Sequence, residues 1–430
     1  MLSIRSLLNI SLFFLSLKAI LPMKKFFFIC FLLLFATVEA QDTNTDLSVY
    51  LDCQSCNTTQ IKQELKNVSF VRDQSDADVH LFFTVQRNAS GGRAYEIEFI
   101  GQKKFSKLHD TLSFDTNSDM SDLEKTNKIL KYIRLGLMRF WIENGLADKI
   151  SVSLQNDEDT DKKEAKDPWN KWSFQLGVNG WFNGEETSKF SNFNGSVSGE
   201  QITDKNKFKF RTGISQRKSV FIYGDQEIIS EKKSKYLTVS DVISINKHWS
   251  AGLFTGMGNS VYNNYKYYWN IQPGVEYNFF PYSISAKKQV VLSYKIGPRF
   301  NKYYDTTIFL KDKELLWKQS ALAGTSFRRK WGSLTTSLEY ASFLHDVSLN
   351  EFNVYMNTNI RLFKGFSLRL NGYYGITHNQ INLSAQGATL EEILLQQKQV
   401  RSGYSYFASV GINYSFGSIY NTIINSRFDF

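Results

Sequence analysis

The segment from residue 351 to residue 375 alternates apolar and polar side chains along two successive legs. Phe352 and Val354 begin the apolar set of the first leg, and Phe366 begins that of the second. Successive side chains of a β-strand point to opposite faces, so this period of two predicts two strands with one apolar face each. Only Phe363-Lys364-Gly365 separates the legs, which predicts a tight hairpin. Each leg is long enough to cross a bilayer as a tilted strand, which takes about 9–11 residues.

The same unit recurs through residues 169–430 and decides the fold class. A soluble sandwich also alternates but seldom keeps strands this long. A transmembrane barrel must do so, with its apolar face towards lipid and its polar face towards a lumen. We therefore predict a mainly β protein, an antiparallel transmembrane β-barrel of about twelve strands preceded by a small α+β domain. The predicted strands are 171–182, 190–202, 207–222, 234–245, 248–258, 265–280, 288–304, 314–328, 331–344, 351–362, 366–377 and 403–416.

Composition agrees with a barrel. Aromatic residues make up 15% of the chain, and the chain contains only 5 Pro. Outer-membrane barrels carry aromatic girdles at both interfaces, and Pro is excluded from central strands. No run of 18 clean apolar residues follows the N-terminal region, which argues against helical spans in the mature chain.

Residues 1–40 are interpreted as a signal peptide region. A first apolar run is broken by Asn9 and Lys18. A second run follows Met23 and two lysines and ends in small residues before Gln41, the arrangement of an export signal. We take Met23 as the start and the Ala40/Gln41 bond as the cleavage point; the alternative is one long helical hairpin anchor. Export places the rest of the chain in an oxidising compartment.

Residues 41–153 are predicted to form a small periplasmic α+β domain with the element order β-α-β-β-β-β-α. Its clearest element is the last helix, where Ser121 and Glu124 form a capping box. Gly145 is the expected stop of that helix. The apolar stripe of the helix is Leu130, Ile133, Leu137, Phe140 and Trp141.

Two cysteines, Cys53 and Cys56, remain after the predicted cleavage. A C-x-x-C pair can be a redox pair, half of a zinc site or a local disulfide. No second such pair exists, and the nearest histidine is His80, which disfavours zinc. We predict a structural disulfide and keep a redox role as the alternative.

Residues 154–168 are predicted to be a charged linker that leads into the barrel. Bacterial barrels have short periplasmic turns and longer outer loops, and this pattern places the small domain in the periplasm. The short connections are 204–206, 246–247, 329–330 and 363–365, with 281–287 somewhat longer, and the longer ones include 223–233, 305–313 and 378–402. In the last of these, residues 389–397 favour a short helix capped by Thr389, which could cover the barrel or contact something outside.

The polar faces of the predicted strands carry many ionisable side chains, more of them basic than acidic. The candidate lumen charges are Lys209, Arg211, Lys295, Arg299, Arg361, Arg369, Glu276 and Glu339. Lys207, Arg217, Lys318 and Glu200 share the same phase. A basic lumen favours anions such as acidic sugars or phosphates. The alternative is a closed plug, in which acidic and basic side chains pair across the lumen.

No catalytic or cofactor motif is found. His248 with Ser250, and His345 with Ser348, have no evident oxyanion hole and are interpreted as incidental. The other histidines form no metal-ligand spacing, and no phosphate loop or dinucleotide fingerprint appears. We therefore predict no enzyme, no cofactor and no metal. The formal charge of +10 is dispersed along an exported chain, which argues against nucleic acid as a partner.

Three stretches carry a resemblance to a family: Asp52-Cys53-Gln54-Ser55-Cys56, Asp76-Ala77-Asp78-Val79-His80, and Phe416-Gly417-Ser418-Ile419-Tyr420-Asn421. With these stretches the layout resembles Bacteroidota outer-membrane β-barrel proteins that have a small periplasmic N-terminal domain. The resemblance implies a location in the bacterial outer membrane and no activity. It implies outer-membrane lipid, including lipopolysaccharide, and the barrel-insertion machinery as partners. The terminal Phe430 is similar to the C-terminal aromatic signature that this machinery reads.

Two functions from different classes remain. The first is a channel or transporter for small, possibly anionic, solutes, resembling a porin. The second is a non-transporting outer-membrane anchor or assembly protein whose periplasmic domain binds a protein partner. The sequence does not separate them.

Overall fold

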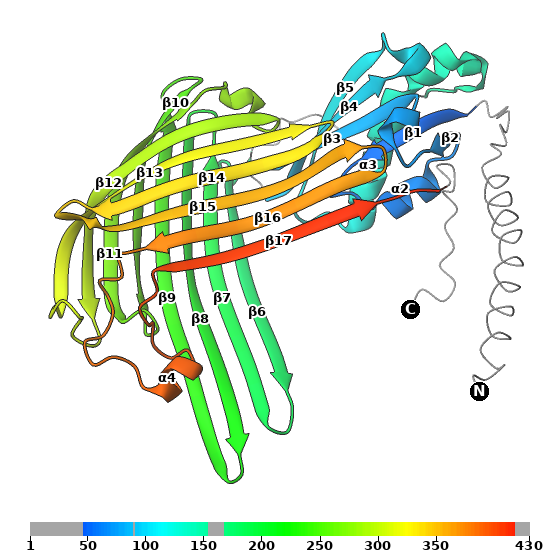
Figure 1. The fold of residues 1–430 in the computed structure, drawn as a ribbon. Coiled ribbons are helices and arrows are strands. Elements are labelled where there is room, and N and C mark those ends of the chain that lie inside the picture. Colours follow the sequence, from blue (N-terminus) through cyan, green and yellow to red (C-terminus); the bar gives the residue numbers. More distant parts are fainter. Residues whose placement is uncertain (1–45, 89–90, 154–166, 418–430) are drawn as a thin grey trace, which may run out of the picture. The chain divides into compact units, whose positions relative to one another are not determined.

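The computed structural model describes residues 46–88, 91–153 and 167–417. These residues form a five-stranded sheet with two helices and a twelve-stranded sheet (Figure 1). The predicted signal peptide at residues 1–40, most of the predicted linker at 154–168 and the chain end at 418–430 lie outside the described residues. Among those that are described, no helix is long and apolar enough to cross a membrane.

The smaller unit has the predicted element order. Its elements are β1 (Leu47–Asp52), α2 (Thr58–Glu64), β2 (Val68–Phe70), β3 (Val79–Arg87), β4 (Arg93–Gly101), β5 (His109–Thr116) and α3 (Asp122–Trp141). The sheet order is β2-β1-β3-β4-β5, in which β1 pairs in parallel with β2 and β3 and the other pairs are antiparallel. One face of this sheet packs against α2 and α3 to form the core. The unit is therefore an α+β layer pair, as predicted.

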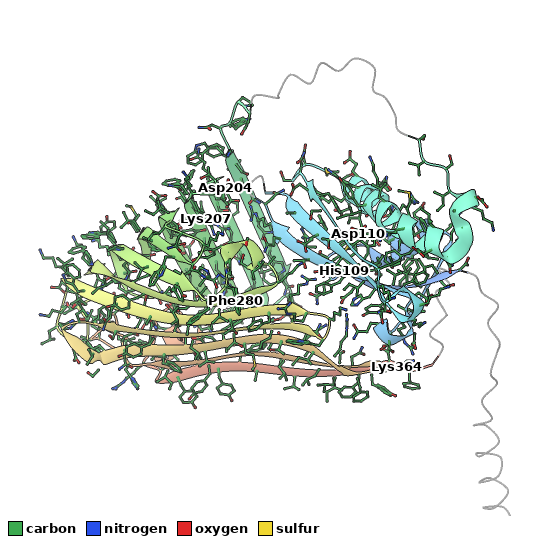
Figure 2. All side chains as sticks on the ribbon, turned by 90° about the horizontal axis from the view of Figure 1, so that it is seen from above. His109, Asp110, Asp204, Lys207, Phe280 and Lys364 are labelled. Atoms are coloured by element: carbon green, nitrogen blue, oxygen red, sulfur yellow. A yellow bond between two sulfur atoms is a disulfide. The ribbon has the colours of Figure 1, made fainter. Side chains whose placement is uncertain are left out.

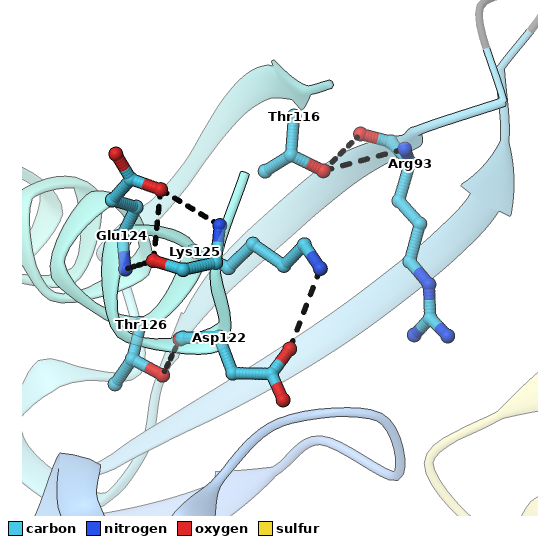
Figure 3. Close-up of polar contacts among 7 residues, drawn as sticks. Arg93, Thr116, Asp122, Glu124, Lys125 and Thr126 are labelled. Carbon is cyan, nitrogen blue, oxygen red and sulfur yellow. Dashed lines mark hydrogen bonds and ion pairs between the residues drawn. The ribbon is translucent and has the colours of Figure 1, made fainter. Parts of the chain in front are cut away.

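Helix α3 begins with the predicted capping box (Figure 3). The backbone N–H of Glu124 donates to Ser121 Oγ over 3.2 Å, and the Glu124 carboxylate accepts from the Ser121 N–H over 2.7 Å. Two N–H groups that the helix itself leaves unpaired are thus satisfied. A π-helical turn, Ile142–Leu146, continues α3, and the φ of +80° at Gly145 ends its right-handed path, as predicted.

Gly136 lets α3 approach the sheet closely. A Cβ atom placed on Gly136 would lie 2.0 Å from Cζ of Phe99 in β4, so no side chain fits there without movement of a buried ring. The stripe of Ile129, Ile133 and Leu137 is buried on the same side. Close packing at this crossing therefore depends on the missing side chain.

We expect Gly136→Ala to destabilise the smaller unit. In an exposed helix this change stabilises by about 1 kcal/mol, but the overpacking against Phe99 costs about 1–3 kcal/mol. Hydrogen exchange of the α3 amides in the full chain measures the result, and faster exchange is expected. Leu135→Ala, at a 42% exposed position beside it, is the control. Slower exchange in the Gly136 variant would contradict the packing argument.

The larger sheet contains twelve antiparallel strands in sequence order, as predicted. They are β6 (Trp172–Gly184), β7 (Ser188–Ile202), β8 (Asn206–Tyr223), β9 (Gln226–Ser244), β10 (Trp249–Ser260), β11 (Tyr265–Asn278), β12 (Lys288–Tyr303), β13 (Lys313–Arg329), β14 (Gly332–Phe343), β15 (Asp346–Phe363), β16 (Phe366–Thr377) and β17 (Tyr404–Tyr414). Each strand pairs with its neighbours in the chain, which fixes which side chains share a face.

The sheet is not closed: its order begins at β17 and ends at β6, and these two edge strands are not hydrogen-bonded to each other. Figure 1 shows the sheet strongly coiled, with β6–β9 and β14–β17 running in different directions. Every residue of β17 is exposed. A closed barrel therefore stays a prediction.

The predicted length of one connection is wrong. Residues 223–233 were expected to form a long loop, but β8 reaches Tyr223 and β9 begins at Gln226, which leaves a turn at 224–225. The early part of β9 has Ile228 and Ile229 next to each other and is otherwise polar, so no alternation marks it as a strand. Connection length alone therefore distinguishes the two ends of the sheet less clearly than expected.

The connections between strands define two ends of the large sheet, which we call the near end and the far end. The near end, where β6 begins, carries connections 203–205, 245–248, 279–287, 330–331 and 364–365. Asp204, Phe280 and Lys364 lie in three of them (Figure 2). The far end carries 185–187, 224–225, 261–264, 304–312, 344–345 and 378–403.

Candidate functional site: the polar face of the large sheet and its covers

One face of the large sheet is apolar and uncovered. Its exposed side chains include Phe174, Leu176 and Val178 of β6, Leu253 and Met257 of β10, Ile271 and Val275 of β11, Leu292 of β12, Leu315 and Trp317 of β13, and Val410 and Ile412 of β17. On β8 the apolar part of this face extends from Phe208 to Ile214, which is roughly 20 Å at about 3.3 Å per residue. Gln216 and Lys218 follow on the same face. An exposed apolar surface of this extent marks a site of contact with protein or membrane.

Aromatic rings gather at both ends of this apolar face. At the near end, the ring of Tyr277 lies 4.8 Å from Trp249, and Phe363 stacks on Phe366 at 4.6 Å. Towards the far end, Trp269 stacks on Phe300 at 6.1 Å. Rows of aromatic side chains flanking an apolar band are typical of the two interfaces of a membrane.

The opposite face is polar and carries the candidate lumen charges. Lys209 pairs with Glu200 at 2.9 Å, and Glu276 accepts a hydrogen bond from Tyr282 at 2.9 Å. Lys295 lies 4.1 Å from the ring centre of Phe254. Arg299 lies 5.2 Å from the ring centre of Tyr265, a geometry that stabilises a cation.

A cavity of about 500 Å³ brings some of these charges together. Its lining includes Lys209, Arg211 and Glu200 of the sheet and Arg87 of the smaller unit. Arg87 lies 3.8 Å from Glu200. The lining does not include the other candidates: Lys295, Arg299, Arg361, Arg369, Glu276 and Glu339. Arg369 pairs in register with Asn359, and Glu339 with Asn353.

Arg361 is used by the smaller unit. Its guanidinium donates to both carboxylate oxygens of Asp52 over 3.0 Å, a bidentate pair. His80 donates from Nε2 to the same carboxylate over 3.3 Å. Asp52 is 7% and His80 1% exposed. Water is therefore excluded from the Asp52 end of the Asp52–Arg361 ion pair. Sequence reasoning placed Arg361 among the lumen charges but found no partner for it, because Asp52 lies 309 positions away.

The smaller unit thus uses both faces of its sheet. In β3, Leu81 and Phe83 belong to the core under α3, whereas His80 and Phe82 are buried on the opposite face. There the guanidinium of Arg328 lies 5.9 Å from the ring centre of Phe82. The second face of the small sheet therefore rests on the large sheet.

Further contacts all fall at the near end of the large sheet. Lys364 lies 2.7 Å from Asp76, and the N–H of Gly365 donates to Asp73 over 2.9 Å. Arg72 donates to the backbone oxygens of Phe416 and Gly417. Lys287 pairs with Glu96 and Glu98 of β4. The smaller unit is held to this end mainly by ion pairs and charge-assisted hydrogen bonds. We call the smaller unit, where it is held by these contacts, the near cover.

Described residues from each of the three stretches that carry the family resemblance take part in the contacts of the near cover. Asp52 comes from the first, Asp76 and His80 from the second, and Phe416 from the third. Cys53 and Cys56, beside Asp52, are joined by a disulfide with their Cα atoms 5.6 Å apart. The disulfide closes the turn that follows β1 and so restrains the chain next to the Asp52 carboxylate.

The pKa values of two interface carboxyls are lowered. Burial by itself raises the pKa of Asp52, but hydrogen bonds from His80 and Arg361 outweigh it and bring the pKa below its usual 3.8. At Asp73, burial is likewise outweighed by hydrogen bonds from Ser75 and Gly365, and the pKa is also lowered from 3.8. Both groups are therefore charged at neutral pH when the unit is docked.

At the far end, residues 378–403 cross the polar face. The segment leaves β16, and its residues reach β9, which six strands (β10–β15) separate from β16 in the sheet order. Ser230 of β9 donates to the backbone oxygen of Leu395 over 3.2 Å, and Gln397 donates to the oxygen of Ile229 over 3.2 Å. Because the sheet coils, the segment bridges strands that are distant within it; we call it the far cover.

The far cover is ordered mainly by neutral groups, with one cation, Lys398, that lies 3.1 Å from Glu392 and 3.5 Å from Asp305. Asn382 is 5% exposed and donates to the backbone oxygen of Asn263, while Asn264 donates to the oxygen of Asn382. Ile381 and Leu383 are buried beside them. The predicted helix is present but shorter, as α4 (Leu390–Leu394), and Thr389 caps it through the N–H of Glu392.

No protein-family model and no curated protein matches this sequence. Within the described part of the chain, no group of three or more His, Cys, Asp or Glu side chains could hold a metal ion. The arrangement that points to a function is a two-faced sheet whose polar face is covered at both ends.

We expect Arg361→Gln to loosen the near cover. The change leaves the Asp52 carboxylate buried without its guanidinium partner, and breaking a buried pair costs roughly 2 kcal/mol when one partner stays partly exposed. Hydrogen exchange of β1 and of the β15–β16 turn in the full chain measures the loss. Lys364→Gln removes a more exposed pair and is the matched control, with an expected cost below about 1 kcal/mol. Equal effects of the two changes would argue against Asp52–Arg361 as the main contact.

The near cover should also loosen in acid. Among the groups that lower the pKa of these carboxyls, Arg361 acts on Asp52 and Gly365 acts on Asp73 across the contact, so docking favours the charged carboxyls. This stabilisation is lost as pH falls through the lowered pKa values. Docking should therefore be constant from pH 7 to about 5 and weaken below about 4. The same exchange measurement over pH tests this, and Asp52→Asn should reduce the pH dependence. An unchanged pH dependence in that variant would assign the effect to other groups.

Proposed function

We propose that this protein is an outer-membrane β-barrel protein through whose polar interior small anionic solutes pass. In this proposal β6 and β17 close the cylinder in the membrane, the apolar face contacts lipid, and the polar face lines the interior. The smaller unit lies on the periplasmic side and the far cover on the outer side. Outer-membrane lipid and the insertion machinery are then the partners of the barrel.

The observation that carries this proposal is the opposite character of the two faces of one sheet. The apolar face is exposed over nearly every strand and is flanked by aromatic pairs at both ends. The polar face carries Lys209, Arg211, Lys295 and Arg299, and a cavity of about 500 Å³ lies against the first two. A basic interior attracts anions and repels cations.

The presence of two covers favours a gated interior rather than a permanently open pore. The near cover includes Arg87, which reaches the polar face and borders the cavity. The far cover crosses to Ser230 and Lys232 on the same face. A solute that passes along this face must therefore displace both covers.

A second candidate, a non-transporting anchor, is favoured by the near cover alone. The smaller unit has one sheet face buried against the large sheet, while Leu123 and Leu135 on α3 stay exposed. In this case the helical side would bind a periplasmic protein partner, and the barrel would fix the unit in the membrane.

Reconstitution into planar bilayers separates the two candidates. If solutes pass, the protein should conduct with anion selectivity, and Lys209→Gln with Arg211→Gln should shift the reversal potential in a KCl gradient towards zero. Lys233→Gln with Lys235→Gln, both on the opposite face of β9, is the charge-matched control. Arg361→Gln should raise conductance, because it weakens the near cover. Folded protein that conducts neither as wild type nor as the Arg361 variant would rule out transport and leave the anchor.

A further inference from the structure

Two rows of side chains cross strands β6–β9 on the polar face near the far end. The backbone register aligns Trp181, Asn192, Arg217 and Lys232 in one row. The next row is Asn183, Phe190, Ser219 and Ser230. Neighbouring strands lie about 4.8 Å apart, so each row spans roughly 14 Å.

The first row places two cations directly opposite each other. Arg217 of β8 and Lys232 of β9 are cross-strand partners, and like charges in this position repel. In the described part of the chain neither forms an ion pair. Carboxylates of neighbouring strands pair elsewhere: Glu231 lies 2.9 Å from Lys233, and Glu200 lies 2.9 Å from Lys209. The repulsion would be relieved by an anion between the two cations.

A cavity of about 650 Å³ lies over these rows. Its floor carries the rings of Trp181, Phe190 and Phe221, of which the last two lie 5.5 Å apart edge to face. Residues 394–396 of the far cover form part of its wall, where Gln396 lies 3.4 Å from Lys232. A ligand held here would contact the sheet and the far cover at once.

We propose that this cavity binds an anionic saccharide. The acid group of the ligand lies between Arg217 and Lys232, which supply charge-assisted hydrogen bonds. Trp181 and Phe190 offer flat apolar surfaces for the C–H face of a sugar ring. Asn183 and Asn192, with two serines, offer partners for its hydroxyls, which a purely apolar acid would not use. The inference rests on the proposed function, since it assigns a place of first contact to the solutes of the polar interior.

Calorimetric titration of the full chain in detergent tests the site without requiring conductance. The probes are glucuronate, glucose and inorganic phosphate. Glucuronate should bind at least about tenfold more tightly than glucose, since charge-assisted hydrogen bonds contribute about 1.5–3 kcal/mol. It should also bind more tightly than phosphate, which cannot use the rings. Phosphate binding as tight as glucuronate would reduce the site to one for inorganic anions and overturn the proposal, and so would the absence of glucuronate binding.

Variants assign the binding to the rows. Arg217→Gln should weaken glucuronate binding about tenfold, and Trp181→Leu should weaken glucuronate but leave phosphate unchanged. Lys218→Gln removes the next positive charge of β8, on the opposite face, and should change neither. Arg217→Gln should not lower the thermal unfolding temperature, because it removes a repulsion. Equal glucuronate affinity in the Arg217 and Lys218 variants would overturn the site, whereas binding without conductance would overturn only transport.

Discussion

The structure depends on the strict opposition of the two faces of a β-strand. Successive side chains point to opposite sides, so one register between neighbouring strands decides the position of every charge on the polar face. Turns such as the one at residues 364–365 hold that register between β15 and β16. A slip by one residue would move Arg361 to the apolar face and a leucine to the polar one. The apolar surface and the aligned cations are therefore consequences of one constraint.

Sequence alternation was informative where one face of a strand is apolar, and it failed where neither face is. The hairpin around Gly365 and all twelve strands were predictable, but residues 226–233 were not, because their two apolar side chains, Ile228 and Ile229, are adjacent and mark no period of two. The Asp52–Arg361 contact was out of reach for a different reason. Alternation is local, whereas this pair joins two different sheets across most of the chain. Closure between β6 and β17 was predicted from strand length and class, and pairing of two distant edges leaves no local signal either.

The candidate lumen charges have different surroundings, which the local sequence pattern did not predict. Phase alone places Lys209, Arg217 and Arg361 on the same face, yet they have three different surroundings. Lys209 has a carboxylate partner, Arg361 is used by the smaller unit, and Arg217 faces another cation. The partner across the strand pair, which only register reveals, decides whether a charge is neutralised, structural or available to a ligand.

The two covers differ in the forces that hold them, and this decides how each can respond. The near cover depends on ion pairs, which are weakened by salt and by protonation of their carboxylates. The far cover depends mainly on amide hydrogen bonds around Asn382 and on buried Ile381 and Leu383, which are insensitive to both. Lys398, which lies 3.5 Å from Asp305, adds one ionic contact. The contact of the far cover with the strands runs through Gln396 and Lys232, beside the opposed cations. In the proposed saccharide site, a bound anion would change the electric field at that contact, whereas the near cover would respond to pH and salt.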